Sequence, residues 1–326
     1  MLEGKDLILA TKPFTKESIV ESWFHLLSTF GLLLFCYTLT IWLEPFGLKI
    51  AFAILSSLVA LRMFIIYHDY LHKAILQNSP AANVIFTIFG LYFLVPPSIW
   101  KRSHDYHHQH NSKLYTSSIG SFPIVTKEKY LSFTKNEKFL YRFIRNPLTI
   151  LFGYIFAFTY GMCIQSLLKS ADKHWDSAVS LVFHYAIGFS IYYFFGIENF
   201  FIAFLLPSFI ASAMGSYLFY AQHNFPSATF EEKEGWTYVS AALQSSSYMK
   251  MNGLMHWFTG NIGYHHIHHL NARIPFYRLP ETYNHFKELQ NAKSTSLNPV
   301  DIYKCLSLAV WDPSQNKMIT YKEMDS

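Results

Sequence analysis

Long apolar stretches dominate the pattern of hydrophobic and polar positions along this chain. Five of them have the length of a candidate membrane crossing, and they cover residues 23–43, 47–67, 81–100, 147–168 and 177–220. A bilayer core of about 30 Å is crossed by about 20 helical residues. The longest stretch is therefore expected to form two spans, 177–196 and 200–220, separated by the polar pair Glu198 and Asn199.

Histidines form a second pattern. The chain has 16 histidines, and nine of them lie in three short runs, HDYLH, HDYHH and HHIHH, beside or near apolar stretches; eight share the helical spacing, and His266 in the third run is an off-face neighbour. Spacings of three and four residues place the imidazoles of each run on one face of a helix. The clustered residues are His68 and His72, then His104, His107 and His108, then His265, His268 and His269.

The clustered histidines are candidate metal ligands. Neutral imidazole suits iron, copper, zinc and nickel, and eight imidazoles without matching cysteines exceed what one ion coordinates, so two metal ions are expected. A redox metal is favoured over hydrolytic zinc because the clusters lie at the ends of apolar helices, far from water-borne substrates. His223, in the run YAQHNFP after the last apolar stretch, is expected to be a ninth ligand at the same membrane level.

Isolated histidines are interpreted differently. His256, in LMHWF, is a weaker ligand candidate. His25, His174, His184 and His285 are expected to be structural, since lone interfacial histidines usually anchor helices or form local hydrogen bonds. His184 falls inside a predicted span, where an ionisable side chain usually faces the interior of the bundle.

A single metal site requires all three clusters on one side of the membrane. The stretch 81–100 joins the first two clusters, so it is expected to be interfacial or re-entrant, with a break at Pro96 and Pro97. The stretch 147–168 is also expected to be interfacial, because a crossing there, followed by the next pair of spans, would put the third cluster on the wrong side of the membrane. The predicted fold is all-α, one domain over residues 1–326, with four transmembrane helices in two hairpins and a helical cap that carries the metal site.

Charge indicates which side carries the cap. The short connections near Pro45 and Gly196 have almost no cations beyond Lys49, so the positive-inside rule assigns the metal-bearing face to the cytoplasm. The cations on that face are Lys101, Arg102, Lys127, Lys129, Lys138, Arg142, Arg145, Lys169 and Lys173.

Composition agrees with a multi-pass membrane protein and argues against other classes. Hydrophobic residues make up 51% of the chain and charged residues only 14%. The net charge of +5 is not gathered into a dense basic block, so nucleic acid is not an expected partner. The three cysteines are far apart and do not predict a disulfide framework, and the N-terminal residues do not have the order of a cleaved signal peptide.

The three histidine runs and their flanks resemble the integral-membrane fatty acid desaturase family. HDYLH has the HxxxH form of the family's first histidine box, and HDYHH and HHIHH have the HxxHH form of the second and third boxes. LVPPSIWKRSHDYHHQHN, YAQHN and GYHHIHHLNARIPFYRLPE also resemble the flanks and the extra histidine of the acyl-lipid branch, which includes plant and bacterial methyl-end desaturases.

This resemblance implies a di-iron centre, molecular oxygen as co-substrate and a fatty acyl lipid substrate in which a cis double bond is formed. It implies as iron ligands the eight clustered histidines and His223. No His-Pro-Gly-Gly haem motif of a fused cytochrome b5 occurs in the sequence, so a separate electron donor, ferredoxin or cytochrome b5, is expected. The methyl-end resemblance points to delta-12 or omega-3 specificity, whereas the run Asp69, Tyr70 and Leu71 departs from many relatives and leaves the double-bond position open.

Two alternatives are left open by the sequence. A di-iron lipid or carotenoid hydroxylase or ketolase would use the same metal site to insert oxygen. A membrane metal transporter or sensor would place polar ligands near the bilayer midplane, whereas all nine candidates lie at or beyond the predicted helix ends. The expected location is the bacterial inner membrane, or the endoplasmic reticulum in a eukaryote.

Overall fold

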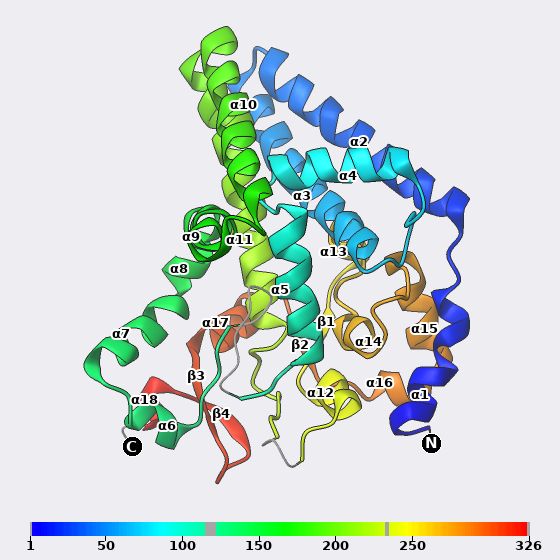
Figure 1. Cartoon of the computed structure of the whole chain (residues 1–326), viewed down its shortest axis with the longest axis vertical. Helices are drawn as coiled ribbons and strands as arrows, with labels where there is room; N and C mark the ends of the chain where they lie inside the picture. The colour runs from blue at the N-terminus through cyan, green and yellow to red at the C-terminus, as the bar shows by residue number, and fades with distance from the viewer. Residues whose placement is uncertain (1, 115–121, 232–234, 325–326) are drawn as a thin grey trace.

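The computed structural model describes residues 2–114, 122–231 and 235–324 (Figure 1). Helices form most of this part of the chain. The long apolar helices are α2 Ile19–Trp42, α3 Phe46–Leu71, α10 Trp175–Asn199 and α11 Leu206–Ala221, with a π-helical segment, η3 Phe200–Leu205, between the last two. The other N-terminal and central helical elements are α1 Gly4–Ala10, η1 Lys12–Thr15, α4 Pro80–Tyr92, α5 Pro97–Gln109, α6 Lys127–Leu131, α7 Lys135–Ile144, α8 Pro147–Leu151, η2 Tyr154–Ile164 and α9 Gln165–Ser170.

Short helices and strands make up the C-terminal third. The helices are α12 Tyr238–Gln244, α13 Gly253–Phe258, α14 His265–Leu270, η4 Phe276–Arg278, α15 Leu279–His285, α16 Lys287–Gln290, α17 Pro299–Ser307 and α18 Tyr321–Met324. Strands β1 Tyr248–Lys250 and β2 Ser294–Ser296 pair in parallel, with Met249 opposite Thr295. Strands β3 Leu308–Asp312 and β4 Lys317–Thr320 form an antiparallel hairpin with Trp311 opposite Met318. The all-α prediction is therefore incomplete, since strands of three to five residues are too short to give a readable alternation.

The first long hairpin, α2 and α3, has the surface of a helix pair in lipid. Ser18 caps α2 by accepting a hydrogen bond from the Glu21 N–H, and the helix ends before Pro45. Outside its contact stripe α2 exposes large apolar side chains such as Phe24 and Phe35, whereas α3 is buried nearly all round towards its C-terminal end. The side chains that α2 buries recur every three or four residues, and they are Ser22, Leu26, Thr29, Leu33, Cys36 and Thr40.

The second long hairpin reverses at the predicted break. Gly196 has φ 81° and ψ 172°, a conformation that strains any residue with a side chain, and the chain then returns through η3 and α11. The two hairpins are joined at this end, because the buried Lys49 ammonium lies 2.7 Å from the Glu198 carboxylate and Trp42 packs edge-on against Phe195. Both turns lie at the end of the molecule drawn uppermost in Figure 1.

Among the described residues, three helical stretches are long and apolar enough to cross a membrane. They are Ile19–Trp42, Phe46–Leu71 and the 47-residue run Trp175–Ala221 that contains Gly196, and the bent pair α4 and α5 adds a fourth candidate if it counts as one span. That pair is bent by 89°, with the break next to Pro96 and Pro97 as predicted. The stretch 147–168 is divided into α8, the π-helix η2 and the start of α9.

Side chains from neighbouring helices hold the bend between α4 and α5. Because the helix is broken here, some backbone carbonyls have no helical partner, and buried side chains form hydrogen bonds with them instead. The Tyr67 hydroxyl donates to the Val95 carbonyl at 2.9 Å, and His184 Nδ1 lies 2.6 Å from the Tyr92 carbonyl. The second nitrogen of His184 lies 2.8 Å from the Tyr154 hydroxyl, so both nitrogens of this mid-helix histidine are used within the fold.

This arrangement predicts that Gly90→Ala destabilises the protein. A Cβ at Gly90 would lie 2.7 Å from the Tyr67 hydroxyl and 3.0 Å from the Val95 carbonyl, and overpacking of this kind costs about 1–3 kcal/mol. Gly31→Ala in α2 is the matched control, because nothing lies within 4 Å of the place that a Cβ would take there. The measurement is the thermal unfolding midpoint of the detergent-solubilised chain; equal midpoints for both variants would contradict the packing described for the bend.

Candidate metal centre

Four segments bring the predicted ligands together. His68 and His72 lie at the C-terminal end of α3, and α5 carries the second cluster after its start at Pro97. The short helix α14 carries the third cluster and is buried along its whole length, while His223 follows the end of α11. Figure 1 draws α5 and α14 next to each other below the long hairpins. The bend before α5 therefore directs the second cluster towards the other two.

The structure sorts all nine predicted residues into two groups, each able to hold a metal ion. Within each group, one nitrogen from every histidine lies within 4.8 Å of the others. We call them group A, which consists of His68, His72, His104, His108 and His268, and group B, which consists of His107, His223, His265 and His269. The groups adjoin, since the rings of His108 and His269 stack with their centroids 4.3 Å apart.

Within group A the Nε2 atoms converge on one another. His104 Nε2 lies 2.7 Å from His68 Nε2 and 3.1 Å from His108 Nε2, and His108 Nε2 lies 3.0 Å from His268 Nε2. The Nε2 atom of His72 is buried and has no hydrogen-bond partner in the described part of the chain. Because one nitrogen cannot donate a proton to two acceptors, hydrogen bonding between imidazoles satisfies this cluster poorly.

Group B repeats the same convergence. His265 Nε2 lies 2.9 Å from His223 Nε2 and 3.0 Å from His269 Nε2, and His269 Nε2 lies 3.1 Å from His107 Nε2. A cation shared by the lone pairs of each group satisfies all of these nitrogens at once, so the donor set fits a pair of transition-metal ions.

Burial keeps these imidazoles in the form that binds metals. Desolvation, together with repulsion between neighbouring rings, holds the pKa of His104, His107 and His108 well below its usual value of 6.5. Burial likewise lowers the pKa of His223 to about 4. The neutral ring has a free lone pair, whereas the protonated ring has none.

In His68 and His223 the Nδ1 atom, on the other side of the ring from the converging Nε2, lies close to a polar group of the protein. His68 Nδ1 lies 3.2 Å from Asp69 Oδ1, and the other carboxylate oxygen accepts a 2.7 Å hydrogen bond from the Phe276 N–H. His223 Nδ1 lies 3.2 Å from the Ser245 carbonyl. Such partners fix which nitrogen faces the metal and raise the basicity of the ligand.

The role of Asp69 was not predicted from the sequence. The first two boxes both begin His-Asp-Tyr, yet Asp69 is buried against His68 whereas Asp105 is exposed and pairs with Lys101 at 2.5 Å. The sequence signal is the same at the two positions, so only the packing of α3 against η4, whose first residue Phe276 donates to Asp69, distinguishes them.

The remaining histidines of the sequence analysis lie outside both groups. His256 stacks on Tyr264, and His285 packs on Phe14 and Phe286. His266, the off-face member of the third run, turns its Nε2 to the Leu289 carbonyl at 3.1 Å. Two others pair with polar side chains: His174 with Ser98 at 2.8 Å, and His25 with Arg62 at 3.1 Å.

A narrow apolar seam leads to both groups. It runs between α3 and α11, and its open volume of about 10 Å³ is close to the space of one water molecule. Its lining includes His68 and His104 of group A and His265 of group B. Its other walls are Leu61, Phe64, Ile65, Gly215, Leu218, Phe219, Gln222 and Ile262.

Comparison with known proteins identifies the family of this chain. A model of the fatty acid desaturase family matches residues 41–299, a range that holds all nine histidines and most of the chain. This chain belongs to the fatty acid desaturase family. A fatty acid desaturase of Bacillus subtilis (strain 168) is 27% identical over 320 residues, which cover 98% of this chain and 90% of that relative. The family is one of oxidoreductases, so the expected family and enzyme class are confirmed for this desaturase.

The environment of Asp69 predicts how metal affinity responds to its charge. Asp69→Asn keeps the size of the side chain but removes the negative charge beside His68, and changes to such partners typically weaken metal binding about 10–100-fold. Asp105→Asn is the matched control in the second box, and we expect wild-type affinity for it. The metal affinity of both variants is measured as the metal that each retains during titration with a chelator. Equal retention by the two variants would refute the orienting role of Asp69.

Proposed function

We propose that this desaturase is a di-iron enzyme that uses molecular oxygen to introduce a cis double bond into the acyl chain of a membrane lipid. The observation that carries the proposal is the apolar seam that touches His68 and His104 of group A and His265 of group B. An acyl chain is the kind of substrate that such walls accept, and a methylene group in this seam is close to both groups.

The metal ligands proposed are all nine histidines of groups A and B. An all-imidazole donor set without thiolates is compatible with iron and with zinc. Iron is favoured because removing hydrogen from an unactivated methylene is an oxidation, which zinc does not support. When bound, the iron pair would supply the redox chemistry by which oxygen takes two hydrogens with their two electrons from the substrate, two electrons from a donor protein and two protons from solvent, leaving two molecules of water.

The side chains of this protein position the substrate and exclude water. Phe64 and Ile65 of α3 face Leu218 of α11 across the seam, so a chain held there is desolvated on both sides. The open volume of the seam is close to that of one water molecule, so its side chains must move apart to admit an alkyl chain, and their shape restricts which methylene reaches the histidines. No protein acid or base is required in this scheme, because the imidazoles are committed to the metal and the seam otherwise has apolar walls and one glutamine, Gln222.

The proposed placement in the membrane follows from the two long hairpins. Four spans, α2, α3, α10 and the run η3–α11, would put both turns on one side and both histidine groups on the other. The cations predicted for the metal-bearing face support a cytoplasmic location, in a bacterial inner membrane or in the endoplasmic reticulum. Exposed Lys101 and Arg102, on the same helix as the second histidine box, would face an acidic electron donor such as a ferredoxin or cytochrome b5.

Expression in a host without polyunsaturated lipids tests the proposed reaction. With a donor protein supplied, we expect gas chromatography with mass spectrometry to reveal a new unsaturated fatty acid in the membrane lipids. The methyl-end resemblance of the histidine-box flanks supports a delta-12 or omega-3 position. His107→Ala should reduce the product to the empty-vector level, since it removes a ligand from group B.

His110→Ala is the control at the end of the same helix. His110 is the residue that caps the C-terminus of α5, its Nδ1 lies 3.0 Å from the Tyr106 carbonyl, and it belongs to neither group, so its removal should leave the product unchanged. A hydroxylated acid in place of the unsaturated one would identify the hydroxylase alternative. Unchanged lipids combined with altered metal uptake would identify a transporter, and full activity of His107→Ala would refute the ligand assignment.

A further inference from the structure

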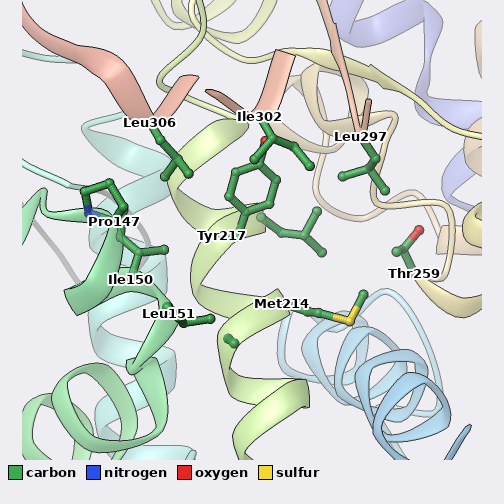
Figure 2. A pocket seen from close by; sticks show the side chains of 11 residues that line it. Pro147, Ile150, Leu151, Met214, Tyr217, Thr259, Leu297, Ile302 and Leu306 are labelled. Carbon is green, nitrogen blue, oxygen red and sulfur yellow. The ribbon is translucent and has the colours of Figure 1, made fainter. Parts of the chain in front are cut away.

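A second apolar cavity lies on a neighbouring face of α11 (Figure 2). It has a volume of about 400 Å³, within the roughly 300–1,000 Å³ range of small-molecule sites. Helix α8 forms one wall, α17 another, and Tyr217 extends from α11 into the space between them. The lining residues are Pro147, Ile150, Leu151, Ala213, Met214, Tyr217, Leu218, Thr259, Leu297, Ile302 and Leu306.

The walls of this pocket select an apolar ligand. No charged side chain lines it, and Tyr217 and Thr259 are its only polar side chains among the described residues. The Thr259 hydroxyl is already committed, since it donates to the Met255 carbonyl at 2.8 Å. The Tyr217 hydroxyl is buried without a hydrogen-bond partner among the described residues and is the one polar group left to a ligand, so a polar metabolite would lose most of its hydrogen bonds to water here, whereas an alkyl chain has none to lose.

The surroundings of the pocket identify the bilayer as the source of that ligand. On α8 and just after it, next to the lining residues, Leu148, Leu151 and Phe152 are exposed. On α17 the lining residues Ile302 and Leu306 are themselves only half-buried, so the pocket opens outward between the two helices. An opening flanked by exposed apolar side chains, on a helix with the length and composition of a span, faces lipid rather than water.

The pocket adjoins the seam that leads to the histidines. Leu218 lines both cavities and is 5% exposed. Along α11, Met214 and Tyr217 face the pocket, whereas Gly215 and Phe219 face the seam. Leu218 is thus a wall shared by a wide chamber and a nearly closed one, and its side chain can change rotamer without any change in the backbone.

We propose that the pocket between α8, α11 and α17 is the lipid-facing entrance of the enzyme, which admits an acyl chain of a membrane lipid and passes it by Leu218 into the seam. The proposal rests on the proposed function for what happens to the chain at the histidines. Binding of the acyl chain in the pocket, however, can be measured without turnover.

Photolabelling tests binding directly. The whole chain is placed in phosphatidylcholine vesicles in which one acyl chain carries a diazirine near its methyl end, and labelled residues are found by mass spectrometry. We expect label on Met214, Ile302 or Leu306 in the wild type. Ile302→Trp fills the pocket and should reduce this label at least about 10-fold, and Leu306→Trp is a second filling variant from the same helix.

Val300→Trp is the matched control, because Val300 lies on the same helix, is 61% exposed and does not line the pocket. It should label and desaturate as the wild type does. Ile302→Trp should retain wild-type metal content but form at least about 10-fold less unsaturated product. Unchanged labelling and product in both filling variants, or label restricted to exposed apolar residues outside the pocket such as Leu254, would refute the proposal that the pocket is the entrance.

The two proposals fail in different ways. A wild-type chain that forms no double bond, yet labels in the pocket and loses that label in Ile302→Trp, would refute desaturation and leave the acyl site standing. A wild-type chain that forms the double bond, with the same yield in Ile302→Trp and Leu306→Trp, would refute the entrance and leave desaturation standing.

Discussion

Nine converging imidazoles, eight of them buried and His72 half-buried, are the constraint around which this molecule is organised. Separations of 2.7–3.1 Å between Nε2 atoms satisfy hydrogen bonding only in part, and burial keeps the rings neutral. Four segments far apart in the sequence must meet to form the two groups. The surrounding fold can be understood as the set of contacts that holds those segments in place.

Two of these contacts are polar interactions that join different segments and are buried in apolar surroundings. At the bend between α4 and α5, Tyr67 and His184 satisfy backbone carbonyls and so fix the direction of the second histidine box. Six residues before His68, the Arg62 guanidinium donates to the Trp257 carbonyl and lies over the Trp257 ring, which ties α3 to the segment before the third box. Each of these interactions provides hydrogen bonds to polar groups that would otherwise be costly to bury.

The sequence was sufficient to predict which histidines come together, because spacing of three and four residues is a local property of a helix. All nine predicted histidines lie in the two groups, and the reversal at Gly196 and the bend beside Pro96 fall where turn residues predicted them. Properties that depend on tertiary packing could not be read in this way. The same His-Asp-Tyr pattern gives a buried partner at Asp69 and an exposed one at Asp105, and the residues of the pocket come from five separate segments.

The count and coordination of the metal test the central claim most directly. X-ray absorption at the iron edge, combined with elemental analysis of the purified active chain, measures both. Groups A and B predict two irons per chain, each surrounded by imidazole nitrogens and without a sulfur ligand. One metal ion per active chain, or a sulfur ligand in its coordination shell, would contradict the account of two all-histidine sites.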